Sequence, residues 1–211
     1  MIEKPSLDHE KALWEQGFFY IAGVDEAGRG AWAGPVMAGA VILPVDEMLL
    51  KIMDGVRDSK QMTAVEREDM ARVVVDQAVC WAVGSADNHE IDRIGILPAT
   101  RLAMERAISS LSVQPQYLLL DYIFLPRLMM PQKSMPKGDV HSLSIAAASI
   151  LAKVSRDHWM STTAAADYPM YGFEQHKGYG TQFHQARLLE FGPCPIHRKS
   201  FKPISKDLTL F

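Results

Sequence analysis

FFYIAGVDEAGRGAWAGPVMAGAVIL, residues 18–43, is the stretch that decides the fold. Its two ends, residues 18–25 and 36–43, are apolar runs bounded by turn-forming residues, which predicts two buried strands. The segment between them is rich in glycine, so the chain can turn back there and bring its backbone close to a ligand. We therefore expect a hairpin of two core strands that carries a functional loop.

Helical and strand patterns alternate along the rest of the chain. Thr63 and Glu66 have the spacing of a capping box, which predicts a helix that runs to about residue 78. This order of elements indicates an α/β protein with a mixed β-sheet flanked by helices, built as one domain of residues 1–211 with 168–211 as a C-terminal extension. We expect further strands at residues 80–86 and 117–121, helices at residues 91–111, 142–166 and 182–190, and an irregular tail from residue 192.

The composition fits a single globular domain, because 48% of the 211 residues are hydrophobic and 22% are charged. The longest apolar run, residues 36–45, is shorter than the roughly 20 residues that a membrane-spanning helix needs. Residues 1–13 are too charged for a signal peptide, so we expect a cytoplasmic protein without membrane contact. Cys80 and Cys194 have no cysteine neighbours, which indicates neither a disulfide framework nor a zinc site.

Charge is distributed unevenly along the chain. The net charge of −3 argues against a phosphate-rich partner, since affinity for phosphates comes largely from Lys and Arg. Residues 127–206, however, hold 11 Lys or Arg against 5 Asp or Glu. The C-terminal half is therefore suited to hold phosphates, and the acidic N-terminal half to hold cations.

Four acidic residues each stand at the end of an apolar strand or just before a helix. They are Asp25, Glu26, Asp121 and Asp139. A carboxylate at such an edge is costly to bury unless it is paired or binds a metal, and caps or salt bridges are the alternative for each one taken singly. Clustered carboxylates without matching His or Cys ligands favour hard cations, Mg²⁺ or Mn²⁺.

The loop Gly28-Arg29-Gly30 follows the first two carboxylates. Its glycines have neither the dinucleotide-binding spacing nor the Lys-Ser or Lys-Thr of a phosphate-binding P-loop. Glycines let backbone N–H groups approach a phosphate or a sugar, although a hairpin turn alone would also account for them. An arginine between the two glycines favours the binding role.

Other polar residues are candidates for substrate contacts, each with an ordinary alternative. Lys153 and Arg156 share one face of the predicted helix 142–166, which is usual for a solvated face as well as for a phosphate site. Lys177 lies close to Tyr179, a pattern that suits a phosphate contact beside a stacked base or sugar, or a ring that anchors its loop to the core. Ser59 and Lys60 lie in a predicted surface loop and are further possible phosphate contacts.

Taken together, these segments resemble bacterial ribonuclease HII over nearly the whole chain. The resemblance rests on GVDEAGRG with AGPV, then DSK, LLLD, KGD, SIAAASILAKVSRD, YPMYGF, HKGYGT and HRKSF, in the order and approximate spacing of that family. It implies a ribonuclease H-like fold with a helical C-terminal extension and a four-carboxylate site. It also implies that Gly28, Arg29 and Gly30 read the ribose 2′-OH at an RNA–DNA junction and that Tyr179 stacks beside it.

The implied activity is hydrolysis of the RNA strand of RNA–DNA hybrids, including cuts 5′ of single ribonucleotides in duplex DNA. Two Mg²⁺ or Mn²⁺ ions are expected, with 3′-OH and 5′-phosphate products, basic side chains on the backbone phosphates, and a monomeric enzyme. The alternatives are a structure-specific DNA nuclease of the same fold and a non-catalytic hybrid-binding module. The chain departs from the commoner family pattern at Ala31-Trp32, at Tyr122 and at residues 140–143, while the four carboxylates are intact.

Overall fold

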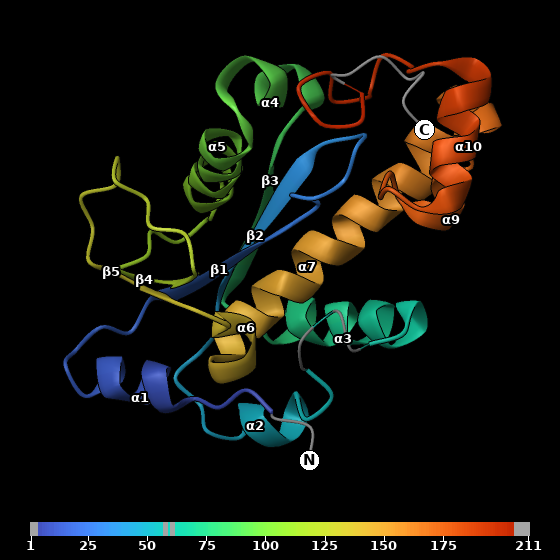
Figure 1. The fold of residues 1–211 in the computed structure, drawn as a ribbon. Helices are drawn as coiled ribbons and strands as arrows, with labels where there is room; N and C mark the ends of the chain where they lie inside the picture. The colour runs from blue at the N-terminus through green and yellow to red at the C-terminus, as the bar shows by residue number, and fades with distance from the viewer. Residues whose placement is uncertain (1–3, 57–58, 60–61, 205–211) are drawn as a thin grey trace.

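The computed structural model describes residues 4–56, 59 and 62–204, and Figure 1 shows their arrangement. A five-stranded sheet has the order β3-β2-β1-β4-β5, with antiparallel β3-β2-β1 and parallel β1-β4-β5. The mixed sheet confirms the predicted fold class. The strands are β1 (Ile21–Ala27), β2 (Val36–Ile42), β3 (Cys80–Ala86), β4 (Tyr117–Asp121) and β5 (Gln132–Met135).

Two strands differ from the prediction. The first strand begins at Ile21 and continues to Ala27, so the carboxylate pair lies inside β1 rather than at its end. Strand β5 is missing from the prediction because its sequence, QKSM, lacks an apolar run. It lies at the sheet edge, where pairing through the backbone requires little side-chain burial.

Helices cover both faces of the sheet. Helix α7 (Leu143–Trp159) crosses β1 and β2 on one face, and α5 (Ile96–Ser109) packs on β2 and β3 on the other (Figure 1). A methyl group on Gly23 or Gly39 would overlap the α7 backbone at Ser144 or Ala148. These two glycines therefore let α7 lie directly on β2 and on β1, the strand that carries the first carboxylates.

The predicted helix 91–111 is wrong as a single element. The structure has α4 (Asn88–Ile94) and α5, separated by Gly95 at φ 85°. A positive φ ends a helix easily at glycine, and Asp87 and Glu90 form a capping box that starts α4. Pro98 then falls in the first turn of α5, where its missing N–H costs nothing.

The long helix predicted for residues 142–166 is present, with a change of geometry near its end. Ser142 caps α7, and the chain passes through a π-helical segment (Met160–Ala164) into α8 (Ala165–Asp167). The predicted helices at 63–78 and 182–190 correspond to α3 (Ala64–Gln77) and α10 (Gln182–Phe191). The remaining helices are α1 (Asp8–Trp14), α2 (Leu49–Ile52), α6 (Gly138–His141), the 3-10 turn η3 (Pro169–Tyr171) and α9 (Phe173–His176).

The C-terminal helices build a small core of their own against the end of α7. Tyr171, Phe173 and Leu188 are buried there, and Ala33 from the glycine-rich loop joins them. Figure 1 shows α9 and α10 grouped at this end of α7. In the part of the chain that the structure describes, no helix has the length and apolar character needed to cross a bilayer.

Candidate active site

Two carboxylates meet at the junction of β1 and β4. These strands are parallel with Val24 beside Leu120, and one further step in the same register places Asp25 beside Asp121. Leu119, two residues before Asp121, packs in one cluster with residues of β1 and α7. Because strand side chains alternate between faces, Asp25 and Asp121 both lie on the α7 face of the sheet.

Asp121 also links the sheet to the segment that carries Asp139. The backbone N–H of Gly138 donates to Oδ1 of Asp121 at 2.7 Å. Asp139 follows directly in the first turn of α6, where it is buried. The third and fourth carboxylates therefore come from neighbouring positions although they lie 18 residues apart in the sequence.

Glu26 follows Asp25 on β1, close enough for its charge to act on Asp25. Its N–H donates to Oδ1 of Asp25 at 2.7 Å, and its Oε1 accepts from Nη1 of Arg29 at 3.0 Å. Arg29 keeps 40% of its side chain exposed, so the guanidinium has one side on Glu26 and the other open to solvent. The arginine of the glycine-rich loop thus lies directly against the carboxylates.

Burial and charge raise the pKa of Asp25 well above its ordinary value. Desolvation is the main cause, and the charges of Glu26 and Asp121 add to it. A hydrogen bond with the Ser149 side chain opposes the shift by stabilising the charged form. The carboxylates of β1 and β4 are therefore close enough to repel one another when all are ionised.

This set of side chains fits a divalent cation by its chemistry. It offers only carboxylate oxygens, which hard cations prefer, and a bound cation would offset the repulsion that raises the pKa of Asp25. Among the described residues, no three His, Cys, Asp or Glu side chains already converge on one point for an ion. A cation would have to draw these neighbouring carboxylates together as it binds.

Ser59 behaves differently from the surface phosphate contact that was predicted. It is buried, and its hydroxyl lies 3.0 Å from the hydroxyl of Ser149, the residue that hydrogen-bonds Asp25. Ser59 therefore supports the carboxylate cluster from behind. Ser149 was missed as a site residue because its small size in an apolar helix suggested only close packing. Lys60 lies outside the described residues.

Arg156 also requires a correction. It is fully buried, and its three guanidinium nitrogens donate to the carbonyl oxygens of Ala33, Pro35 and Lys177 at 2.9–3.0 Å. With every nitrogen engaged and none at the surface, the side chain holds two loops together and does not reach a backbone phosphate. The sequence pattern could not separate a buried arginine from one on a solvated helix face.

Tyr179 lies beside this arginine with its ring partly exposed. Lys153 Nζ is 5.2 Å and Arg156 Cζ 5.3 Å from the ring centroid, both within cation–π distance. Lys153 also pairs with Asp157 at 2.8 Å, and Lys177 Nζ donates to the carbonyl of Glu174. The predicted basic and aromatic residues of the C-terminal half are thus neighbours.

The loop of Tyr179 is joined to the glycine-rich loop. The N–H of Trp32 donates to the carbonyl of Gly178 at 2.8 Å. A side chain on Gly178 would meet the carbonyl of Ala33, and one on Gly180 would overlap the Trp32 ring. Glycines therefore allow the two loops to lie in direct contact, which brings Tyr179 and Arg29 to one region of the surface.

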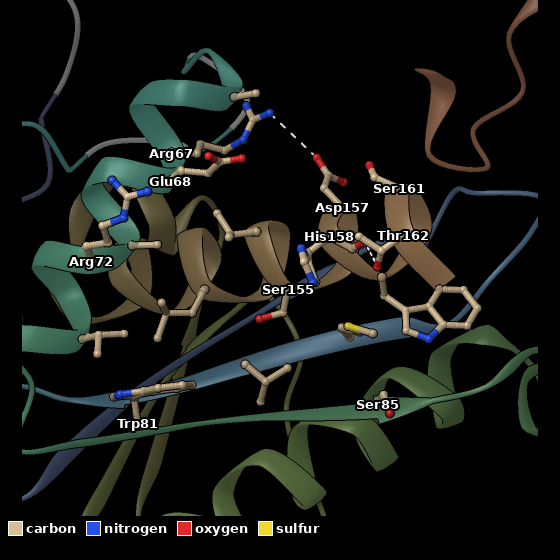
Figure 2. Close-up of a pocket in the computed structure, with 18 of the residues that line it drawn as sticks. Arg67, Glu68, Arg72, Trp81, Ser85, Ser155, Asp157, His158, Ser161 and Thr162 are labelled. Atoms are coloured by element: carbon tan, nitrogen blue, oxygen red, sulfur yellow. Dashed lines mark hydrogen bonds and ion pairs between the residues drawn. The ribbon is translucent and has the colours of Figure 1, made fainter. Parts of the chain in front are cut away.

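A cavity of about 970 Å³ lies elsewhere, between α3, α7 and strands β2 and β3. Figure 2 shows Trp81 on its floor and the 3.8 Å ion pair of Arg67 with Asp157 at its rim. None of the four carboxylates lines it. The cavity therefore lies apart from the carboxylates, although Lys177 of the Tyr179 loop lines it.

Solved structures share this fold. Ribonuclease H2 from Pyrococcus horikoshii OT3 superposes with a TM-score of 0.72 and 26% identity, over 88% of this chain and 95% of that one. Bst-RNase HIII in complex with Mn²⁺ gives a TM-score of 0.67 and 19% identity, over 89% and 68% of the two chains. The fold and the carboxylates at the end of β4 and within β1 define the class of protein as a ribonuclease H-like nuclease.

The sequence narrows this class. The family model of ribonuclease HII matches residues 22–204. Ribonuclease HII from Desulfitobacterium hafniense (strain DSM 10664 / DCB-2) is 50% identical over 97% of this chain and 76% of the relative. The chain belongs to the ribonuclease HII family, and it is a ribonuclease H, an endonuclease that degrades RNA in RNA–DNA hybrids.

Proposed function

We propose that this ribonuclease H cuts RNA–DNA hybrids, and duplex DNA 5′ of single ribonucleotides, at the cluster of Asp25, Glu26, Asp121 and Asp139, leaving 3′-OH and 5′-phosphate ends. The observation that carries the proposal is the burial of Asp25 against two further carboxylates. Such an arrangement is unfavourable in an empty protein, because like charges repel strongly away from water. It becomes favourable when a cation binds.

The four carboxylates would hold Mg²⁺ or Mn²⁺, with two ions in the catalytic complex. When bound, the ions supply a deprotonated water and stabilise the charge that develops on the leaving oxygen. Ser149 holds Asp25 in place through its hydroxyl, and Arg29 holds Glu26. Bst-RNase HIII shares the fold and has been crystallised with Mn²⁺, so Mn²⁺ is a suitable ion to test beside Mg²⁺.

Recognition of the ribonucleotide would fall to the loop Gly28-Arg29-Gly30 and to Tyr179. The support is their position, since Arg29 contacts Glu26 and the two loops are hydrogen-bonded to each other. The 2′-OH is the feature that distinguishes a single ribonucleotide from the surrounding DNA. Lys153 lies beside the Tyr179 ring, and Lys177 lies in the same loop as Tyr179. Both would contact phosphates without reading sequence.

We further propose that the enzyme acts in the cytoplasm, as a monomer, and as one domain whose C-terminal extension, described as far as residue 204, packs on the sheet-bearing part. The support for the last point is a β-bridge between Ala33 and His197, together with the core that Ala33 shares with Tyr171 and Phe173. The loop nearest the carboxylates is thus part of the same packed unit as the C-terminal helices.

The proposal is tested with three duplexes of one sequence: DNA with a single ribonucleotide, a full RNA–DNA hybrid, and plain DNA, each with Mg²⁺ or Mn²⁺ and with excess chelator. We expect cuts in the first two duplexes only, 5′ of the ribonucleotide in the first, and none with chelator. Cutting of plain DNA at a similar rate would instead indicate a structure-specific DNA nuclease. Tight hybrid binding without any cut would indicate a binding module.

A further inference from the structure

Two fully buried arginines from the C-terminal half of the chain hold the glycine-rich loop. Arg156 comes from α7, and Arg198 comes from the irregular segment after α10. In the described part of the chain, all six hydrogen bonds of their guanidinium groups go to main-chain carbonyl oxygens, five of them in residues 28–35. The loop is therefore held in place by side chains that never reach the surface.

Arg198 holds the part of the loop nearest the carboxylates. Its Nη2 donates to the carbonyl of Gly28 at 2.8 Å, its Nη1 to that of Arg29 at 2.9 Å, and its Nε to that of Gly34 at 3.0 Å. The carbonyls of two successive residues thus turn toward one buried guanidinium. Such a turn needs unusual backbone angles, which Gly28 provides at φ 92°.

The opposite side of these peptide groups faces outward. In a trans peptide the N–H points away from the C=O, so the N–H groups of Arg29 and Gly30 point away from Arg198. Gly30 is exposed, and Arg29 is partly exposed. Successive N–H groups on one side of a chain form a concave donor site for an oxygen atom. The direction of both donors is set by the buried guanidinium behind them.

The backbone around Arg198 is itself anchored. Its N–H donates to the carbonyl of Trp32 at 2.8 Å. The next two backbone N–H groups, of Lys199 and Ser200, both donate to the carboxylate of Asp92 on α4 at 2.9 Å. Arg198 is therefore held on two sides. Its guanidinium bonds the glycine-rich loop, and the backbone that follows it bonds α4.

We propose that Arg198 is a positioning residue for ribonucleotide discrimination, which acts by fixing the peptide groups of Gly28 and Arg29 so that the N–H groups of Arg29 and Gly30 meet the ribose. This proposal rests on the recognition role proposed above for that loop. Arg198 does not touch substrate. Arg156 differs from it, because its carbonyl partners are Ala33, Pro35 and Lys177 rather than Gly28 and Arg29.

The experiment compares the wild-type protein with Arg198→Lys and Arg198→Met. Affinity is measured by fluorescence anisotropy, with Ca²⁺ in place of Mg²⁺, for a duplex that carries one ribonucleotide and for the same duplex in plain DNA. We expect the preference for the ribonucleotide to fall about tenfold in Arg198→Met, the factor for one lost hydrogen bond, and less in Arg198→Lys. The affinity of both variants for plain DNA should stay within about twofold of the wild-type value.

Leu188→Ala is the matched control for loss of stability. Leu188 is buried in the same C-terminal core and makes no contact with the loop carbonyls through polar atoms. It should lower the Tm while leaving the preference of the folded protein unchanged. All affinities are corrected for the folded fraction. Unfolding alone would lower the apparent affinity for both duplexes by the same factor.

An unchanged preference in both Arg198 variants, or an equal loss of affinity for both duplexes, would overturn the role of Arg198. If Arg198→Met does not fold, the Lys variant decides alone, because it keeps the charge but lacks the planar fork of nitrogens that reaches three separate carbonyls. A wild-type protein that shows no preference and no cut at the ribonucleotide would instead contradict the proposed recognition function. The two failures are therefore distinguishable.

Discussion

Ser149 hydrogen-bonds the Asp25 carboxylate, and the Ser59 hydroxyl lies 3.0 Å from that of Ser149, so Asp25 is held by a neutral hydroxyl rather than by a positive charge. A lysine at that place would stabilise the carboxylate more strongly, but it would also compete with a metal ion for it. A hydroxyl orients the carboxylate and leaves its charge available. At the scale of single residues, a neutral hydrogen-bond partner thus orients Asp25, while the neighbouring carboxylates repel its charge.

Asp25→Asn should therefore stabilise the metal-free protein and abolish cleavage. The raised pKa means that the folded state binds the Asp25 proton more tightly than the unfolded chain, so ionisation costs stability. That cost is absent below the unfolded value of 3.8 and complete above the raised folded pKa. A gain of about 1 kcal/mol would raise the Tm by about 2 to 4 °C at this chain length.

Thermal melts in chelator across pH provide the check. The Tm advantage of Asp25→Asn over wild type should be largest at neutral pH and should shrink as the pH falls toward 4. A variant less stable than wild type at neutral pH would show that the Asp25 carboxylate is stabilising without a metal, contrary to the electrostatics of the cluster.

Tyr179→Ala should reduce cleavage of a single-ribonucleotide duplex by about ten- to a hundredfold, because stacking on an aromatic ring is worth about 1 to 3 kcal/mol. The ring is only partly buried and carries two cations near its centroid, so Tyr179→Phe should retain most of the activity. The comparison uses the initial cleavage rates and the melting temperatures of both variants. A much lower Tm for Tyr179→Ala with unchanged activity per folded molecule would mean that the ring only anchors its loop.

At the scale of elements, apolar runs and caps predicted most of the sheet and the long helices. The strands at 80–86 and 117–121 and the cap at Ser142 appear as predicted, because burial and capping leave local patterns in the sequence. Strand β5 and the break at Gly95 were missed, since polar edge strands and single positive φ angles leave little pattern. The four carboxylates were proposed from their positions at strand ends or just before a helix and from the family resemblance, and their role stays a prediction.

The supporting residues were harder to predict. Arg198 and the histidines of the C-terminal helices look like ordinary polar residues in a loop-rich tail, and only folding brings them into the interior. His176, His184 and His197 are all buried there, with Nε2 of His184 3.0 Å from Nε2 of His197. Nδ1 of His184 contacts the carbonyl of Tyr179 at 3.0 Å, so this chain of rings helps to hold the Tyr179 loop.

The histidine chain should make the C-terminal helices sensitive to acid. Burial lowers the pKa of His184 to about 3 and that of His197 to about 4, against an ordinary value of 6.5. The unfolded chain therefore takes up protons first, and stability present above pH 6.5 is lost as the pH falls toward 4. His184→Asn should reduce the slope of the free energy of unfolding against pH by about 1.4 kcal/mol per pH unit, the effect of one proton.

Urea unfolding of wild type and His184→Asn at several pH values between 7 and 4 measures this slope. Asn keeps an amide donor for the Tyr179 carbonyl but cannot titrate. His89→Asn, at an exposed position on α4, is the matched control for the change of histidine to asparagine. Equal slopes for wild type and His184→Asn would mean that the buried ring does not govern acid stability.

At the scale of the whole molecule, the acidic sheet edge and the basic C-terminal half meet through the glycine-rich loop. Trp32 and Ala33 bond to Gly178 and His197 in the C-terminal part, while the start of the same loop lies beside Glu26. The proposed cation site and the proposed phosphate contacts would thus lie on two sides of one connecting loop. The central claim is that the carboxylates perform the cut and that the rest of the molecule positions the substrate for it.

The most direct test is the rate at which Asp121→Asn cuts a single-ribonucleotide duplex in saturating Mg²⁺. Asparagine retains the Oδ1 that accepts from Gly138, so the fold and the Tm should be nearly unchanged while one metal-binding charge is lost. We predict a fall on the order of a thousandfold, equivalent to roughly 4 kcal/mol of transition-state stabilisation. A folded variant that cuts within tenfold of the wild-type rate would contradict the assignment of the active site.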